Sequence, residues 1–536
     1  MKAFNSSLAL CLLATASCSA SANPEYDYVV IGSGAGGGPL ATNLARHGYS
    51  VLLLEAGGDH VNSSLTTIPV MANTAAEDPE ISWQFFVNHY SDPDEAQKDS
   101  KFTWQLTNGS YYVGSNPPPD AKARGMLYPR GATSNRNNLS IVLPDDGFFQ
   151  VVSTAMTALG DSHSPSKDEV WKLLHRNGNS LDGNRFEKNR ITEHTLHHDQ
   201  KHRRSSPGTY LKSTIDETYS NGTQKYLLTV STNSLATKLL FNNSTDVKSV
   251  VGVEYLKGVA LYKADPRSNE ADSGSAMAAV AKREVIVAGG AFNTPQILKL
   301  SGIGPQAELE EFSIPVEVPL PAVGTNLQDN YEIGVEGLAS KDFFNTFENC
   351  TTAFAPGDPC FDEFMKTGTG PYTQGPMLSL LMRSSQSENT DADLWFFGGA
   401  NGVFRGFWPG WSNATAPGRD SDLAALVEGM ELALDIFGKV EAPWAPFNVT
   451  RPIQSLEEEA KYESWGHHAS CSCPMGIDQD TSCVDSRFRV HGVENLRIVD
   501  GSVFPRVPGG FPVAATFMIS EKAEDVILED ARKLAK

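Results

Sequence analysis

Residues 26–58 constrain the fold of this chain more than any other stretch. The apolar, β-branched run 28–31 is typical of a buried parallel strand, and three glycines follow it in G-x-G-x-x-G spacing. Gly32 permits a tight turn, Gly34 lets a pyrophosphate approach the backbone, and Gly37 lets a helix pack on the strand. We expect that helix over residues 39–47, with its N-terminus directed at the phosphates.

An acidic residue completes this unit. A second strand, expected over 51–54, ends at Glu55, 21 residues after Gly34. A carboxylate at this distance accepts the ribose hydroxyls of an adenosine and repels a 2′-phosphate. The glycine motif alone is weak evidence, but strand, helix and acid together predict a dinucleotide site.

The N-terminus has the pattern of a secretory signal peptide. Lys2 precedes an apolar run over 8–16, which is too short to span a bilayer, and Ala20-Ser21-Ala22 offers a cleavage site. We therefore expect a signal peptide over residues 1–22, a secreted or secretory-pathway protein and no membrane anchor. The rest of the chain is long enough for two domains.

Charge excludes one class of partner. The net charge of −21 and the pI near 5 argue against binding to nucleic acid. The basic run 201–204 is an exception, which we interpret as a solvated face.

N-glycosylation is expected from the number of acceptor sites. Nine N-x-S/T sequons follow the signal, at Asn62, Asn108, Asn138, Asn221, Asn242, Asn243, Asn349, Asn413 and Asn448.

Five cysteines remain after the signal. Cys350 and Cys360 flank a loop containing proline and glycine, and we expect a disulfide between them in an oxidising compartment. Among Cys471, Cys473 and Cys483 the pairing stays open, and one of the three must remain unpaired.

Along the rest of the chain, segments with a strand and helix pattern alternate with segments that lack a dinucleotide signature. A helix is expected near 148–159, β patterns return from 226 to 287, and a helix is expected to begin at Thr294-Pro295. Residues 320–451 are rich in aromatic side chains and carry no dinucleotide signature. This alternation predicts two interleaved domains.

Four motifs resemble the GMC (glucose-methanol-choline) flavin oxidoreductase family. They are GSGAGGGPLATNLA with Glu55, YPRGAT ending near residue 133, VIVAGGAFNTPQILKLSGIGP at 285–305 and VHGVENLRIVDGSVFP at 490–505. They lie in family order over nearly the whole chain after the signal. The segments SWGHHASCSCPMG and RVPGGFPVAATFMISEKAED are most similar to secreted fungal members that act in secondary metabolism.

The resemblance implies an α/β fold, with a Rossmann-like FAD-binding domain assembled from residues 23–145, 205–318 and 485–536. An α+β substrate-binding domain on a large sheet, residues 146–204 and 319–484, would be interleaved with it. FAD would be the cofactor, a small-molecule alcohol the substrate, and dioxygen or a quinone the electron acceptor. The FAD contacts implied by motif are Gly32, Gly34, Gly37, Glu55 and Leu235 on the ADP half, Arg130, Gly131 and Asn138 beside the isoalloxazine, and Asp500 and Gly501 along the flavin.

His468 occupies the catalytic position of the family, because HASCSCPMG overlays the motif H-x-x-G-T-C-x-M-G. The resemblance implies oxidation to a carbonyl by hydride transfer to flavin N5, with this imidazole taking the hydroxyl proton. On an extended segment the neighbouring His467 would point to the opposite face. An alternative joins both histidines and the three cysteines in a metal cluster, but motif and compartment account for them more simply, and we expect no metal.

Two departures from the family pattern leave alternatives open. The loop RGATSNRNN lacks the L-G-G that family members carry there, and Phe511 stands where the family has a second His or Asn. Phe511 can neither accept nor donate a proton. The alternatives are a non-redox flavoprotein similar to the hydroxynitrile lyases of the family, or a catalytically impaired homologue.

Overall fold

The computed structural model describes residues 23–130, 145–160, 163–174, 190–192, 198–242, 247–269, 271–343, 347–373, 378–387, 392–398, 405–411 and 423–534. The expected signal peptide and the segment 131–144 lie outside these residues.

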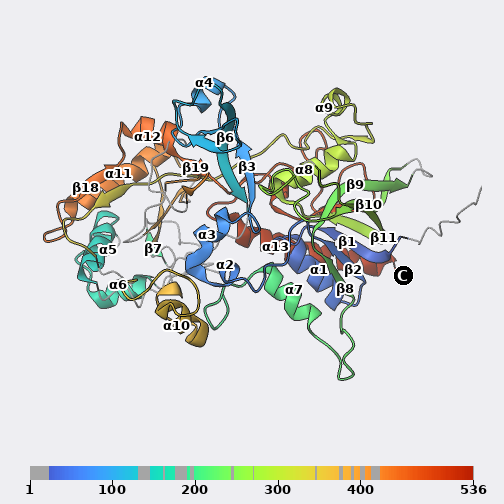
Figure 1. Cartoon of the computed structure of the whole chain (residues 1–536), viewed down its shortest axis with the longest axis horizontal. Coiled ribbons are helices and arrows are strands. Elements are labelled where there is room, and N and C mark those ends of the chain that lie inside the picture. The colour runs from blue at the N-terminus through green and yellow to red at the C-terminus, as the bar shows by residue number, and fades with distance from the viewer. Residues whose placement is uncertain are drawn as a thin grey trace, which may run out of the picture.

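A seven-stranded mixed sheet dominates one half of the molecule, at the right in Figure 1. Its path is β8-β2-β1-β11-β10-β9, with β20 pairing β11. Strands β8, β2, β1, β11 and β20 run parallel to one another. Strand β10 is antiparallel to both β9 and β11. The bounds are β1 (Glu25–Ile31), β2 (Val51–Leu54), β8 (Leu228–Ser231), β9 (Ser234–Asn242), β10 (Ser249–Lys257), β11 (Ser275–Val287) and β20 (Leu496–Ile498).

These strands come from three separated parts of the chain, as the predicted discontinuous Rossmann-like fold requires. β1 and β2 belong to the first predicted segment, β8 to β11 to the second and β20 to the third. The predicted α/β fold class is therefore confirmed, while the domain boundaries stay predictions.

Helix α1 (Gly37–Arg46) packs on β1, β2 and β8, and α7 (Pro207–Ile215) and α13 (Pro512–Leu534) pack against α1. All of β2 and the second half of β1 are buried, as expected for the central strands of a parallel sheet. Core side chains such as Val30, Leu44 and Ile286 have no exposed surface. Each one buried contributes about 1.5–3 kcal/mol to folding.

The other half of the molecule, at the left in Figure 1, is mainly helical. Its helices are α5 (Asp146–Ala158), α6 (Lys167–Leu174), α10 (Pro359–Thr367), α11 (Leu423–Lys439) and α12 (Leu456–Glu463). In the described residues its main sheet has three strands, β17 (Leu394–Gly398), β16 (Leu378–Met382) and β7 (Arg190–Thr192). This three-stranded sheet is smaller than the large sheet expected for the substrate-binding domain.

A four-stranded sheet lies between the two halves in Figure 1. It consists of β3 (Trp83–Val87), β6 (Lys122–Arg130), β4 (Thr103–Gln105) and β5 (Tyr111–Val113). The remaining elements are short: α2 (Ser64–Thr67), η1 (Pro69–Met71), α3 (Ala72–Glu77), α4 (Pro93–Ala96), β12 (Ile303–Gly304), α9 (Gln306–Glu311), β13 (Val318–Pro319), β14 (Tyr331–Glu332), β15 (Glu336–Leu338), η3 (Pro371–Thr373), β18 (Asn448–Arg451), β19 (Trp465–Gly466) and η5 (Gly501–Val503).

The helix expected to begin at Thr294-Pro295 begins four residues earlier. Helix α8 spans Gly290–Leu300 and has Pro295 inside it. A proline at this position cannot donate to the carbonyl of Ala291. The hydroxyl of Ser472 donates to that carbonyl instead, over 2.5 Å, and so ties α8 to the segment that carries His468.

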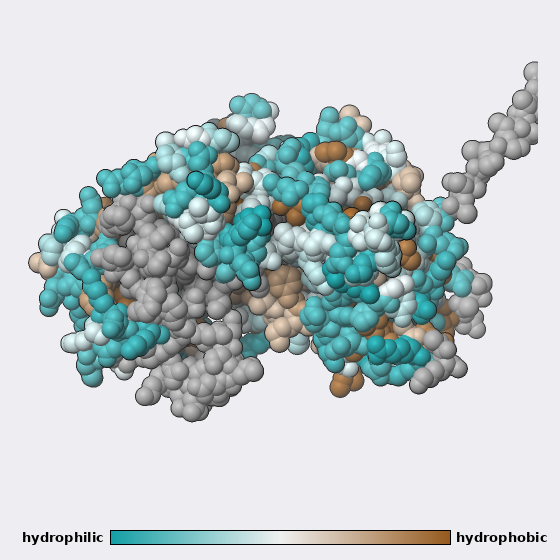
Figure 2. Space-filling model, turned by 90° about the horizontal axis from the view of Figure 1, so that it is seen from below, coloured by the Kyte–Doolittle hydropathy of each residue, from teal (hydrophilic) through white to brown (hydrophobic). Residues whose placement is uncertain are grey.

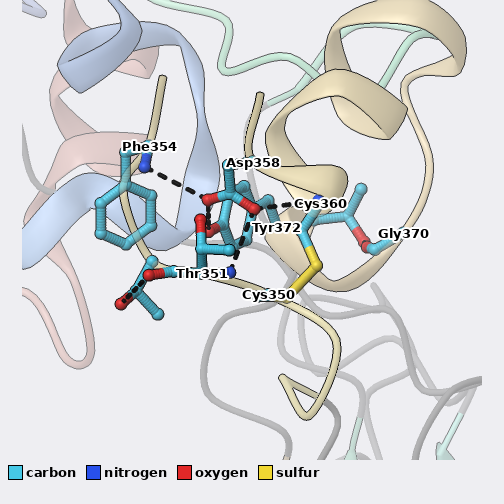
Figure 3. The surroundings of a disulfide bond; sticks show 9 residues. Cys350, Thr351, Phe354, Asp358, Cys360, Gly370 and Tyr372 are labelled. Atoms are coloured by element: carbon cyan, nitrogen blue, oxygen red, sulfur yellow. Dashed lines mark hydrogen bonds between the residues drawn. A yellow bond between two sulfur atoms is a disulfide. The ribbon is translucent and has the colours of Figure 1, made fainter. Parts of the chain in front are cut away.

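The predicted disulfide between Cys350 and Cys360 is present, and the other three cysteines are free and buried. Figure 3 shows Asp358 beside it, accepting backbone N–H bonds from Thr351, Phe354 and Cys360. The buried Tyr372 hydroxyl also donates to Asp358. One carboxylate therefore organises the loop that the disulfide closes.

Replacing both Cys350 and Cys360 with serine should lower the free energy of unfolding by about 2.5–3 kcal/mol, because a cross-link over ten residues restricts the unfolded chain. Thiol labelling of the unfolded wild-type protein without reductant should modify Cys471, Cys473 and Cys483 alone. Labelling of Cys350 under those conditions would show that the bond does not form.

The surface seen in Figure 2 is largely hydrophilic, with an apolar group near the middle of the molecule. Of the helices in the described part of the chain, none is long and apolar enough to cross a bilayer.

Candidate active site

The glycine loop between β1 and α1 has the geometry of a phosphate-binding turn. Gly32 has φ +99°, which favours glycine, and a Cβ on Gly37 would lie 2.1 Å from the carbonyl oxygen of Gly32. A Cβ on Gly34 would meet nothing within 4 Å. The loop thus leaves open space above Gly34, where the sequence places the pyrophosphate.

Glu55 lies directly beside this loop. Its Oε2 accepts bonds from the backbone N–H and hydroxyl of Ser33, and its Oε1 accepts from the N–H of Gly57. The backbone of Asn233 donates to Gly57 and that of Ser234 to Glu55. Leu235, the next residue, is therefore held near Glu55, and both lie where the motif predicts the adenosine.

Gly36 is a closely packed residue of this loop that the glycine motif alone does not single out. A Cβ there would lie 1.9 Å from the carbonyl oxygen of Val499. The Ser520 hydroxyl of α13 donates to the carbonyl of Gly36 over 2.7 Å. The glycine loop is thus fitted against both the 499–503 segment and the C-terminal helix.

Asp500 joins three elements. Its carboxylate accepts bonds from the N–H of Gly290, the hydroxyl of Thr294 and the N–H of Ser502. It therefore fixes the start of α8 and caps η5. The structure gives Asp500 a positioning role, and Gly501 follows it at the partly exposed edge of this segment.

The segment after His468 runs beside η5. Cys471, Cys473 and Met475 donate backbone bonds to the carbonyls of residues 501, 502 and 503. Cys471 has φ +68° and stands where the family motif has glycine. The left-handed backbone explains a preference for glycine at this position.

His468 is buried, with 7% of its surface exposed. Its backbone N–H donates to Asp329 Oδ1 over 2.7 Å. The hydroxyl of Tyr128 donates to the other oxygen of Asp329 and accepts from the N–H of Ala469. Asp329 and Tyr128 hold the histidine segment in place.

The expectation that His467 and His468 face opposite sides is wrong. Their ring centroids lie 4.0 Å apart, and both Nδ1 atoms face Glu332 Oε1, at 3.7 and 3.5 Å respectively. Strand β19 ends at Gly466, so the alternation of an extended strand no longer applies to the two histidines.

Glu332 is the site residue that the sequence reasoning missed. Burial, reinforced by the nearby Asp329 carboxylate, raises the pKa of Glu332 to about 8, although the indole of Trp465 donates to its Oε2 over 3.0 Å. The antiparallel pair of β14 and β19 places Glu332 opposite Trp465. Each strand has only two residues, and so the sequence shows no pattern that predicts this pairing.

Phe511 does occupy the neighbourhood of His468, with ring centroids 4.9 Å apart. Trp395 and Phe397 of β17 pack on Phe511 at 4.5 and 5.5 Å, which forms an aromatic wall next to the imidazole. The Asn330 amide donates to the carbonyls of residues 508 and 510 and so holds the loop before Phe511.

Of the contacts predicted beside the isoalloxazine, the structure describes Arg130 alone. Arg130 ends β6, where its backbone pairs with Trp83. Gly131 and Asn138 lie outside the described residues, and so does the part of the loop in which family members carry L-G-G.

A buried cluster of charged side chains consists of Arg451, Glu459 and Glu463. It lies close to the site, because Arg451 and Glu463 line a small cavity together with Trp465. Arg451 donates to both Glu459 and Glu463, at 2.5 and 2.7 Å. Burial raises the pKa of Glu463 to about 7, opposed by Lys101 and Arg451 and assisted by Glu459 and Asp99. The folded protein therefore keeps a proton here that the unfolded chain loses near pH 4.5.

The stability of the wild-type protein should fall relative to that of Glu463→Gln as the pH rises from about 4.5 to 7. The folded state binds the extra proton in this window, so the difference should reach on the order of 2 kcal/mol. Thermal unfolding of both proteins across this window tests it. A difference in midpoint that does not change with pH would contradict the raised pKa.

The sheet order, the glycine loop and Glu55 define an α/β protein built to bind a dinucleotide.

Comparison with known families agrees with this conclusion. Two sequence profiles of the GMC oxidoreductase family match residues 156–332 and 412–520, together more than half of the chain. A pyridine nucleotide-disulphide oxidoreductase profile matches residues 26–117. This chain belongs to the GMC oxidoreductase family, which confirms the predicted class of protein and FAD as its cofactor.

Curated relatives include two oxygen-dependent choline dehydrogenases. That of Pseudomonas entomophila (strain L48) is 30% identical over 339 residues, and that of Pseudomonas putida (strain F1) is 31% identical over 337 residues. Each alignment covers 56% of this chain and 56% of the relative. The chain thus spans about half the length of the curated relatives it matches.

Solved structures show the same fold over nearly the whole chain. A formate oxidase variant from Aspergillus oryzae has a TM-score of 0.62 at 18% identity, covering 96% of this chain and 100% of that one. A fungal aryl-alcohol oxidase has a TM-score of 0.57 at 16% identity, covering 95% and 99%. At these identities the likeness concerns the fold alone.

Proposed function

We propose that this protein oxidises a small-molecule alcohol, one with a hydroxylated aromatic group, to a carbonyl compound. The observation that carries the proposal is the placement of His468, which is buried, fixed by Asp329 and backed by an aromatic wall. Names of its relatives are consistent with this chemistry, since they include choline dehydrogenases and an aryl-alcohol oxidase.

The residues of the glycine loop fit FAD. The open space above Gly34 and the left-handed turn at Gly32 suit a pyrophosphate, and Glu55 offers carboxylate oxygens to a ribose. Leu235 would contact the adenine, and Gly501 would lie along the flavin. FAD, when bound, supplies the acceptor for the hydride that leaves the alcohol carbon.

His468 would act as the general base that takes the hydroxyl proton of the alcohol. A neutral imidazole suits this role near neutral pH. Glu332 Oε1 faces its Nδ1 at 3.5 Å and, after a small approach into hydrogen-bond range, would orient the ring, a part that Phe511 cannot play. The chain thus replaces the second family residue with a carboxyl group from a different segment.

An aromatic alcohol fits the wall beside the base. Phe511, Trp395 and Phe397 present rings that stack on flat, apolar substrates, and burial near His468 excludes water from the reacting group. An aromatic natural product would be in keeping with the resemblance to secreted fungal members of secondary metabolism.

Secretion and N-glycosylation are part of the proposal. The Cys350–Cys360 disulfide suits an oxidising compartment. Of the six sequon asparagines that the structure describes, five are exposed: Asn62, Asn108, Asn221, Asn349 and Asn448. Dioxygen or a quinone would accept the electrons.

Anaerobic mixing of the purified flavoprotein with a panel of aromatic and aliphatic alcohols tests the proposal. Aromatic primary alcohols should bleach the flavin, and aliphatic ones should do so more slowly. A hydroxynitrile-lyase-like protein would release cyanide from cyanohydrins with its flavin unchanged. A protein purified without flavin would instead favour the impaired homologue.

A further inference from the structure

We propose that Glu332, His467 and His468 form a binding site for a Zn²⁺ ion. One ligand atom from each of the three residues lies within 4.8 Å of the other two. Among the described residues this is the group placed to share a metal ion, and no cysteine of the described chain joins it, unlike in the metal cluster considered from the sequence.

The distances match a metal better than direct hydrogen bonds. The Nδ1 atoms lie 3.7 and 3.5 Å from Glu332 Oε1, beyond the range of about 2.7–3.2 Å for hydrogen bonds. In a tetrahedral zinc site with bonds near 2.0–2.1 Å, neighbouring ligand atoms lie about 3.3 Å apart. A small inward movement of the side chains would complete the site, with water in the fourth position.

The ligands are also held in orientation. The Trp465 indole donates to Glu332 Oε2, which leaves Oε1 directed at the imidazoles, and Oε1 accepts no hydrogen bond from the described residues. The His467 ring packs edge-on against Phe407 at 5.2 Å, and the His468 ring packs against Phe511. Such outer contacts fix ligand geometry in zinc sites.

The charge and the type of the ligands favour a divalent ion that binds both nitrogen and oxygen ligands. One carboxylate and two imidazoles suit zinc, whereas calcium and magnesium prefer oxygen ligands alone. Binding would release the proton that Glu332 holds near neutral pH, and the ion would then compensate the buried carboxylate.

The site has a consequence that rests on the proposed function. A zinc ion on His468 would occupy the imidazole that takes the substrate proton. Zinc should therefore slow the reduction of the flavin by alcohol, and a chelator should restore it.

Binding is measured directly by equilibrium dialysis of the tag-free holoprotein against micromolar Zn²⁺, with metal and flavin both quantified. The wild type should take up one ion per chain that Glu332→Gln and His467→Ala bind about tenfold or more weakly. His202→Ala should bind as the wild type does, because His202 is a half-buried histidine outside the Glu332, His467 and His468 group, and its Nδ1 is hydrogen-bonded to the carbonyl of Gly368 over 2.6 Å.

Equal zinc uptake by the wild type and both site variants, or loss of the ion in His202→Ala, would overturn the proposal. If Glu332→Gln fails to fold, His467→Ala decides. No alcohol is present in this experiment, so its outcome is independent of whether the protein oxidises alcohols.

Discussion

Gly34→Asp should abolish FAD binding while the protein still folds. A side chain at this position meets no protein atom within 4 Å, and Gly34 is not among the residues of positive φ, so the native backbone accepts it. The carboxylate would instead occupy the space of the pyrophosphate and repel it at the N-terminus of α1. Flavin content per protein, read from the visible spectrum, should fall to near zero.

Gly438→Asp provides a matched control. Gly438 also has open space for a Cβ and a φ outside the left-handed region, but it lies in α11, far along the chain from the glycine loop. This variant should keep its flavin. A Gly34→Asp protein that stays fully yellow would contradict the dinucleotide site.

His468→Ala should bind FAD normally and slow the reduction of the flavin by alcohol about 10²- to 10⁴-fold, the range typical for loss of a general base. The upper half of this range is expected because Phe511 offers no substitute. Stopped-flow absorbance under anaerobic conditions measures this step directly.

His467→Ala is the informative comparison, because both imidazoles face Glu332 at similar distances. We expect a much smaller effect, since His468 holds the motif position and packs against Phe511. If His467→Ala is the slower variant, or if His468→Ala stays within about threefold of the wild type, far below the general-base range, then His468 is not the base.

The local unit around the cofactor could be predicted because its causes lie within about thirty residues of sequence. A buried strand, glycines at defined spacing and an acid at the end of the next strand each leave a pattern. The structure places Gly32, Gly34, Gly37 and Glu55 together as the motif required.

The parts that failed depend on contacts between distant segments. Glu332 reaches His468 through a two-residue strand pair, which has no sequence signature. The preference for proline at helix starts predicts a start of α8 four residues too late, because the hydroxyl of the distant Ser472 satisfies the carbonyl that Pro295 leaves free.

Two residues that depart from the family pattern, Cys471 and Phe511, could be identified from the sequence, but their structural parts could not. Cys471 could be aligned with a family glycine, but only the structure shows the left-handed backbone that makes glycine suitable there. The sequence predicts that Phe511 cannot replace a base, whereas its part in an aromatic wall with Trp395 and Phe397 depends on the packing of β17.

Oxidation of an alcohol by the bound flavin is tested most directly by a stoichiometric anaerobic reaction with an aromatic primary alcohol. The loss of flavin absorbance and the carbonyl product are measured in the same sample. We expect one carbonyl molecule formed for each flavin bleached. A flavin that stays oxidised with every alcohol of the panel, or bleaching without a carbonyl product, would contradict the account.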